Sequence, residues 1–186
     1  MSIKVDRKEI LDSIRANVQD GNMVKHMLAT EAIMHVLAKK LGEDEEEWGL
    51  TGLLHDIDVE LVERDPGSHS KLGADIAQEL GASEKMAHAI LCHNEAHGIP
   101  RETILDKALF CADPLSGLIT AAALVRPDKL NGLTTKSVMK RFREKRFAAG
   151  VSREQLLSCQ EIGLELEEFV ASGLEAMKSI TSELEL

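Results

Sequence analysis

Apolar residues recur with the 3.6-residue period of an α-helix along most of this chain of 186 residues. The alternation of apolar and polar residues that is typical of strands is nearly absent. Ile10, Ile14 and Val18, for example, share one face of a predicted helix over residues 6–18. Hydrophobic residues make up 44% of the chain, which is enough for the core of one domain of this length. The sequence therefore predicts an all-α fold and a single domain over residues 1–186.

Glycines, prolines and N-cap residues divide this pattern into successive helices. The predicted helices cover residues 6–18, 22–41, a segment that starts after the acidic run 43–47, 69–80, 83–94, a segment from 103 onward, 135–149, and one or two acidic helices up to 186. We expect Gly21 to cap the first helix in a left-handed conformation and Gly42 to end the second. Pro114 lacks an N–H and disfavours a helical residue before it, so we expect a kink or a restart there.

Charge and cysteine content exclude several classes of protein. The formal net charge of −10 opposes binding to a polyanion such as bulk nucleic acid. The three cysteines have no CxxC spacing, so neither a disulfide framework nor a thiolate zinc site is expected. No apolar run approaches the roughly 20 residues that cross a bilayer, and the N-terminal residues lack the order of a secretory signal. We therefore expect a soluble cytoplasmic protein with no membrane partner.

The sequence LLHDID places two charged or polar groups, His55 and Asp56, directly after two leucines in a segment that otherwise resembles core. A buried ionised carboxylate is costly unless a positive group lies beside it, and a metal ion is the simplest such partner. The alternative is that Asp56 only caps the end of its helix or pairs with His55.

Three further histidines share helical faces with core residues, because each residue of a helix turns by about 100°. They are His26, His69 and His93. His35 and His88 fall off these faces, and His35 is expected at the surface. Asp113 lies among apolar neighbours in a later segment. Each of these histidines alone could be a hydrogen-bonded core residue, but imidazoles and carboxylates together are ligands for divalent cations. The set as a whole favours a metal centre.

The order His26, then His55 and Asp56, then Asp113 resembles the H…HD…D signature of the HD-domain metal-dependent phosphohydrolases. The resemblance covers residues 22–125. It implies an HD-type helical bundle over that range, with residues 126–186 as a C-terminal helical extension packed on it. The segments SHSKLGADIAQELG and AILCHNEAHG resemble the branch of bacterial HD nucleotide phosphohydrolases that has additional histidines.

This resemblance implies two metal sites. His26, His55, Asp56 and Asp113 would hold the first ion, and His69 and His93 would complete a second site that Asp56 bridges. One or two divalent ions per chain are expected, and Fe, Mn, Co, Ni, Zn and Mg all suit such ligands.

The chain departs from the family pattern at three places. Asp58 and Val59 stand where many relatives have the glycine and lysine of HDIGK, so a phosphate-contacting lysine is missing. Asn94 follows His93 where relatives of this branch have a second histidine, and His97 could replace it. Pro114 directly follows Asp113 and can alter the aim of its carboxylate. These departures keep open a second hypothesis, a non-catalytic HD-like domain that senses a nucleotide or a metal.

The implied chemistry is hydrolysis of a phosphate ester or anhydride through a metal-bound hydroxide, with a nucleotide or similar small phosphorylated molecule as substrate. Asp56 and Asp58 are the candidate catalytic residues, Asp58 as a general acid or base. For Asp58 the slightly stronger alternative is a solvent-exposed carboxylate at a helix end. Residues 126–146 carry eight lysines and arginines against two acidic residues. Arg126 and Lys129 are therefore predicted to contact substrate, unless this stretch is only a solvated face.

Two further hypotheses, one about function and one about assembly, remain open. A plain helical interaction module would let the histidines satisfy one another without any metal. The apolar stripes after about residue 134 would suit packing onto the domain, and they would also suit the interface of a homodimer.

Overall fold

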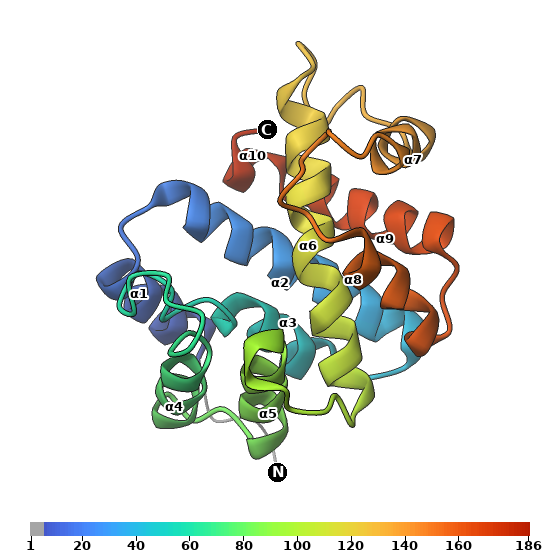
Figure 1. The fold of residues 1–186 in the computed structure, drawn as a ribbon. Helices are drawn as coiled ribbons and strands as arrows, with labels where there is room; N and C mark the ends of the chain where they lie inside the picture. The colour runs from blue at the N-terminus through green and yellow to red at the C-terminus, as the bar shows by residue number, and fades with distance from the viewer. Residues whose placement is uncertain (1–5) are drawn as a thin grey trace.

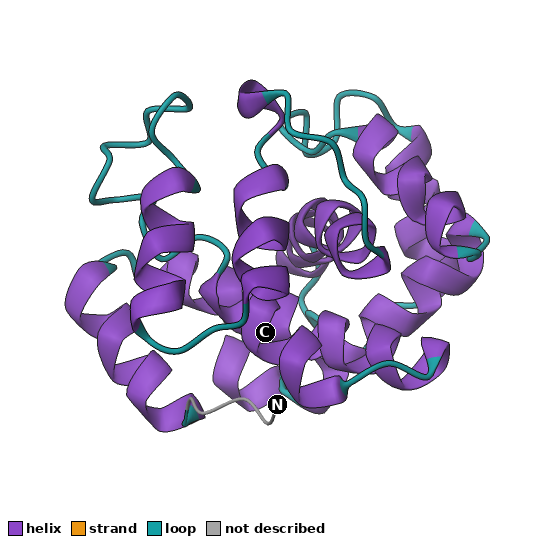
Figure 2. Ribbon diagram, turned by 90° about the horizontal axis from the view of Figure 1, so that it is seen from below, coloured by secondary structure: helices purple, strands orange, loops and turns teal. Residues whose placement is uncertain are grey.

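Helices are the only regular secondary structure in residues 6–186, the part of the chain that the computed structural model describes (Figures 1 and 2). They are α1 (Arg7–Asn17), α2 (Gly21–Leu41), α3 (Glu45–Leu54), α4 (Lys71–Glu79), α5 (Glu84–Cys92), the 3₁₀ helix η1 (Glu95–His97), α6 (Ile104–Leu124), α7 (Thr135–Arg143), α8 (Arg153–Leu157), the 3₁₀ helix η2 (Ser158–Ile162), α9 (Leu166–Ser179) and α10 (Thr181–Leu184). The predicted all-α class is confirmed. Residues 1–5, which the predicted domain includes, lie outside the described residues.

Most helix ends follow the predicted capping chemistry. Ser83 caps α5 by accepting a hydrogen bond from the Met86 amide, and Gly42 ends α2 with a φ of 74°. The prediction for Gly21 is wrong, because this residue begins α2 and does not cap α1. Its neighbour Asp20 is the N-cap, and its carboxylate accepts from the Asn22 amide, so the turn between the two helices is organised by a side chain.

The predicted restart at Pro114 is also wrong, since α6 runs from Ile104 to Leu124 without interruption. A proline inside a helix costs about 3 kcal/mol, and tertiary packing can offset that cost. Two thirds of the apolar stretch of α6 is buried, and the helix packs against α2, α5, α8 and α9 (Figure 1). Among the described helices, α6 is the one long and apolar enough to cross a bilayer by length and composition, but its burial is that of a core helix.

Close approach between α2 and α3 sets the position of the first histidines. A Cβ atom on Gly52 of α3 would lie 2.9 Å from the Thr30 carbonyl oxygen of α2, so only glycine fits at this crossing. One helical turn earlier, a Cβ atom on Gly49 would lie 2.4 Å from Nε2 of His35. His35, expected at the surface, is in fact half-buried and packs against α3. The glycines thus bring the end of α3 directly against α2.

Candidate metal centre

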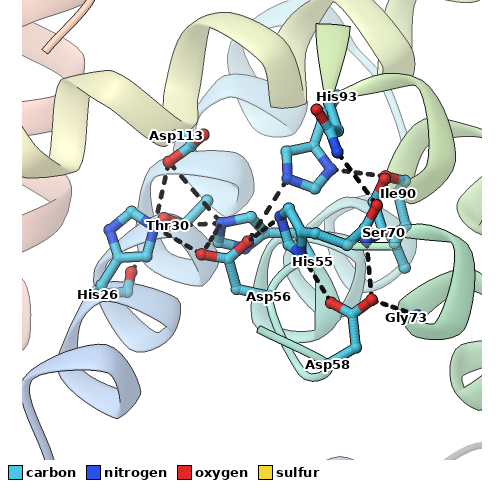
Figure 3. A network of polar contacts seen from close by, with 12 residues as sticks. His26, Thr30, His55, Asp56, Asp58, Ser70, Gly73, Ile90, His93 and Asp113 are labelled. Atoms are coloured by element: carbon cyan, nitrogen blue, oxygen red, sulfur yellow. Dashed lines mark hydrogen bonds and ion pairs between the residues drawn. The ribbon is translucent and has the colours of Figure 1, made fainter. Parts of the chain in front are cut away.

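Six side chains from distant parts of the chain meet at one place in the structure. Figure 3 labels all of them except His69. They are His26 on α2, His55 at the C-cap of α3, Asp56 just after it, His69 in the turn before α4, His93 at the C-cap of α5, and Asp113 on α6. The structure therefore brings together all six residues that were predicted as metal ligands.

Four of these side chains form a first group of ligand atoms. Nε2 of His26 lies 3.1 Å from both Nε2 of His55 and Oδ1 of Asp113. Oδ2 of Asp56 is 3.5 Å from each of the two Nε2 atoms. Ligands held about 2.1 Å from one ion are separated by about 3.0 to 3.4 Å in octahedral or tetrahedral geometry. Nε2 of His55 and Oδ1 of Asp113 are 3.8 Å apart, so two of these distances fall in this range and three lie slightly beyond it. The spacing of the group is therefore close to what a single divalent ion requires.

The other oxygen of Asp56 belongs to a second group. Oδ1 lies 3.2 Å from Nε2 of His69 and 3.4 Å from Nε2 of His93. One carboxylate thus presents separate oxygens to two sets of imidazoles, which is the arrangement of a ligand that bridges two ions.

Hydrogen bonds at Nδ1 fix the orientation of all four imidazoles. Nδ1 of His55 donates to the Gly52 carbonyl at 2.7 Å, and Nδ1 of His93 donates to the Ile90 carbonyl at 2.5 Å. Nδ1 of His69 donates to Oδ1 of Asp58 at 2.8 Å. Nδ1 of the fourth imidazole, His26, bonds to the hydroxyl of Ser116 at 2.8 Å. A proton on Nδ1 leaves Nε2 with a free lone pair, which is the form of histidine that binds a metal.

Ser116 completes the set by tying His26 to the helix that carries Asp113. Its hydroxyl donates to the Asp113 carbonyl at 2.9 Å, so its oxygen accepts from Nδ1 of His26 at 2.8 Å. With their protons on Nδ1, His26 and His55 face each other with two lone pairs at 3.1 Å. Such a contact is repulsive unless a cation or a proton lies between the atoms. The donor set therefore fits a divalent cation.

The electrostatics of the site favour positive charge. Burial opposes the charged form of His55, but the carboxylates of Asp56 and Asp113 outweigh it and raise the pKa to about 9. Burial also opposes protonation of His69, whereas hydrogen bonds to Asp56 and Asp58 raise its pKa to about 10. The pKa values of both ligand carboxyls, Asp56 and Asp113, are lowered against the effect of their burial by the surrounding imidazoles. Nitrogen and oxygen ligands of this kind suit borderline divalent metals.

Asp58 does not point toward the metal ligands, so the prediction that its carboxylate reaches a reacting water is wrong. The side chain is fully buried, and both of its oxygens are engaged. Oδ1 accepts from His69, while Oδ2 accepts from the backbone amides of Ser70 at 2.7 Å and Gly73 at 2.8 Å (Figure 3). Asp58 therefore positions His69 and does not face the centre.

His97, the predicted replacement for a missing ligand, is also engaged elsewhere. Its Nε2 bonds to the His69 carbonyl at 2.7 Å. The Asn94 amide donates to the same carbonyl at 3.1 Å and to the Pro66 carbonyl at 2.8 Å. Both side chains thus hold the turn before α4 in place. His88 lies in a separate group, where it bonds to Asp106 at 3.1 Å.

A cavity of about 520 Å³ opens beside the first group of ligands. It is lined by Asn22, Lys25, His26, Gly117, Thr120, Ala121, Leu124, Lys129, Leu184, Glu185 and Leu186. Lys129, predicted from the sequence, lies on its wall, whereas Lys25 and Glu185 were missed. The prediction that Arg126 contacts the substrate at this cavity is wrong. Arg126 lies in another hollow with Lys140 and Arg141 and pairs with Asp128 at 2.9 Å.

Comparison with known proteins agrees with this geometry. The family model for the HD domain matches residues 23–118, half of the chain. Ribonuclease Y of Oleidesulfovibrio alaskensis is 34% identical over 96 residues, 52% of this chain and 18% of that protein. Ribonuclease Y of Lawsonia intracellularis is 34% identical over 103 residues, 55% of this chain and 20% of that protein. The chain thus spans about a fifth of the length of these curated relatives, and no solved structure matches it. The chain belongs to the HD-domain family of metal-dependent phosphohydrolases.

Proposed function

We propose that the chain hydrolyses phosphate esters or anhydrides of nucleotides or similar small phosphorylated molecules, and that the six converging ligands hold one or two divalent metal ions for this reaction. The observation that carries the proposal is the convergence of four Nε2 atoms and two carboxylates next to an open cavity. When bound, the cations would supply an acidified water molecule and neutralise the charge of a phosphoryl group.

The side chains of the site define the direction from which a substrate would approach. His55 is fully buried and His93 is 5% exposed, whereas His26 and Asp113 are 22% and 29% exposed at their side chains. The cavity also begins at His26. A phosphoryl group would therefore enter between α2 and α6, with Asp56 behind it, and the rest of the molecule would lie in the cavity.

The lining of the cavity supports a small substrate with an anionic and an apolar part. Lys25 and Lys129 bring positive charge, and Ala121, Leu124 and Leu184 provide an apolar wall. A hollow of this size suits a ligand of nucleotide dimensions. The net charge of −10 opposes a long polyanion. The names of the relatives nevertheless make a short RNA the first competing substrate to test.

The test is hydrolysis by metal-loaded protein of a panel containing nucleoside mono- and diphosphates, other small phosphate esters and a short single-stranded RNA. We expect turnover of at least one small nucleotide that chelator abolishes. Asp56→Ala is the inactive comparison, and His88→Ala is its matched control because His88 lies in a separate group. Cleavage of RNA alone would overturn the small-substrate proposal. Binding of nucleotide with no turnover of any compound would favour the sensor.

A further inference from the structure

Both lysines of the cavity are held by one residue, Glu185. Nζ of Lys25 pairs with the Glu185 carboxylate, and Nζ of Lys129 donates to the Glu185 carbonyl oxygen at 2.6 Å. The two lysines come from helix α2 and from the loop after α6, so residues more than 100 positions apart meet at Glu185. The same cavity begins at His26, one of the ligands of the metal centre.

Three features of Glu185 indicate that another anion could replace it at the two lysines. The Glu185 side chain is 75% exposed, so this carboxylate is not needed to fill the core. Lys129 and Glu185 both adopt left-handed backbone conformations, with φ angles of 47° and 56°. Residues other than glycine seldom adopt this conformation, and such strain tends to be kept at functional sites. The pKa of Glu185 is lowered, first by its hydrogen bond to Lys25, so the carboxylate is ionised.

The Glu185 carboxylate bound to Lys25, and the backbone carbonyl of the same residue bound to Lys129, occupy the place that another anion could take. The cavity has metal ligands at one end, lysines on its wall and apolar side chains between helices α6 and α10. A substrate whose scissile phosphoryl group lay at the metal centre would carry its remaining groups past these lysines. Glu185 and an anionic group of that substrate would then compete for the same two ammonium groups.

We propose that Lys25 and Lys129 bind a second, uncleaved anionic group of the substrate, and that Glu185 holds this subsite until the substrate displaces it. The inference rests on the proposed function, because it places the scissile group at the metal centre. The class of substrate it predicts is a small molecule with two anionic groups joined by a less polar part.

The test measures binding of α,ω-alkylene bisphosphonates with one to six methylene groups, because these compounds contain no bond that a phosphohydrolase can cleave. Titration calorimetry with metal-loaded protein compares each compound with the alkylphosphonate of equal length. We expect at least one bisphosphonate to bind more tightly than its single-anion counterpart. Lys25→Gln or Lys129→Gln should each weaken that bisphosphonate by about threefold to fivefold, the size of an exposed ion pair. Glu185→Gln should strengthen it by a similar factor.

Two matched controls accompany these variants. Glu183→Gln changes a carboxylate in α10, two residues before Glu185, that faces Arg7 at 3.9 Å in another hollow. Lys40→Gln removes a lysine that pairs with Glu168 at 2.7 Å and is remote from the cavity. Neither control should change bisphosphonate affinity.

The outcomes separate this inference from the proposed function. If no bisphosphonate of any length gains affinity over its single-anion counterpart, or if Glu185→Gln changes nothing, the inference is wrong even when hydrolysis is observed. If metal-loaded protein hydrolyses nothing, the proposed function fails, while lysine-dependent bisphosphonate binding would still support the anion subsite.

Discussion

Replacing Asp58 with asparagine tests how the second group of ligands is oriented. The carboxylate accepts three hydrogen bonds, from Nδ1 of His69 and from the amides of Ser70 and Gly73. An asparagine can keep its oxygen toward the two backbone amides, and its NH₂ group then faces Nδ1 of His69. The ring relieves this clash by moving its proton to Nε2, where Oδ1 of Asp56 at 3.2 Å can accept it. That proton occupies the lone pair that a metal would need.

The magnitude follows from the bond that is lost. A hydrogen bond to a charged group is worth about 1.5 to 3 kcal/mol, and metal-orienting partners of this kind typically change affinity about 10- to 100-fold. Competition titration with a fluorescent chelator should show one dissociation constant weakened by roughly that factor and the other unchanged. Asp65→Asn is the control, because Asp65 lies in the same turn and its exposed carboxylate accepts hydrogen bonds from its near neighbours, among them Ser68 at 2.7 Å, and none from a histidine. Unchanged affinity at both sites together with lost activity would refute the positioning role and restore Asp58 as an acid or base.

Three further outcomes can be measured. Asp56→Ala removes the ligand shared by both groups, so elemental analysis should find no bound metal in this variant. The control variant His88→Ala should keep its full metal content. Metal retained by Asp56→Ala would contradict the assignment. In chelator-treated protein the pKa values of His55 and His69 are raised to about 9 and about 10, above the value in the unfolded chain. The stability that these two protonated rings add to the folded state is therefore full below about pH 6.5 and is lost as the pH rises through about 9 to 10. Metal binding needs neutral rings, so the rise in Tm on adding metal should be larger at pH 9 than at pH 6, and an equal rise would count against these rings as ligands. Burial raises the pKa of the Cys92 thiol to about 12 and that of Cys159 to about 11, and Cys111 is also fully buried. A thiol reagent at pH 8 should therefore label no cysteine in the folded protein and three in denaturant, and rapid labelling without denaturant would show that these thiols are accessible.

The helical faces could be predicted from the sequence because the rotation per residue is fixed. His26, His69 and His93 were placed toward the core by their spacing from apolar residues, and the structure brings them together. The same arithmetic fails where the chain is not helical or where distant segments meet. His69 itself lies just outside α4, in a turn held by Asn94 and His97.

The role of Asp58 could not be predicted, because it depends on the path of the turn between residues 55 and 70. No periodicity specifies that path. Arg126 and Lys129 illustrate the same limit, since they are three residues apart and face different hollows. Glu185 lies 160 residues from Lys25, and nothing local in the sequence relates them. Pro114 shows the opposite case, in which a strong local signal yields to the packing of the helix that contains it.

The four imidazoles differ in what restrains them. His55 and His93 are anchored to carbonyl oxygens three residues earlier in their own helices, which no substitution can delete. His26 and His69 depend on the side chains of Ser116 and Asp58, which a single codon change can replace. Substitutions at these two positions can therefore change the basicity and ring orientation of His26 and His69, while His55 and His93 keep theirs. Metal preference in this chain could be retuned through positions 58 and 116 without altering any ligand.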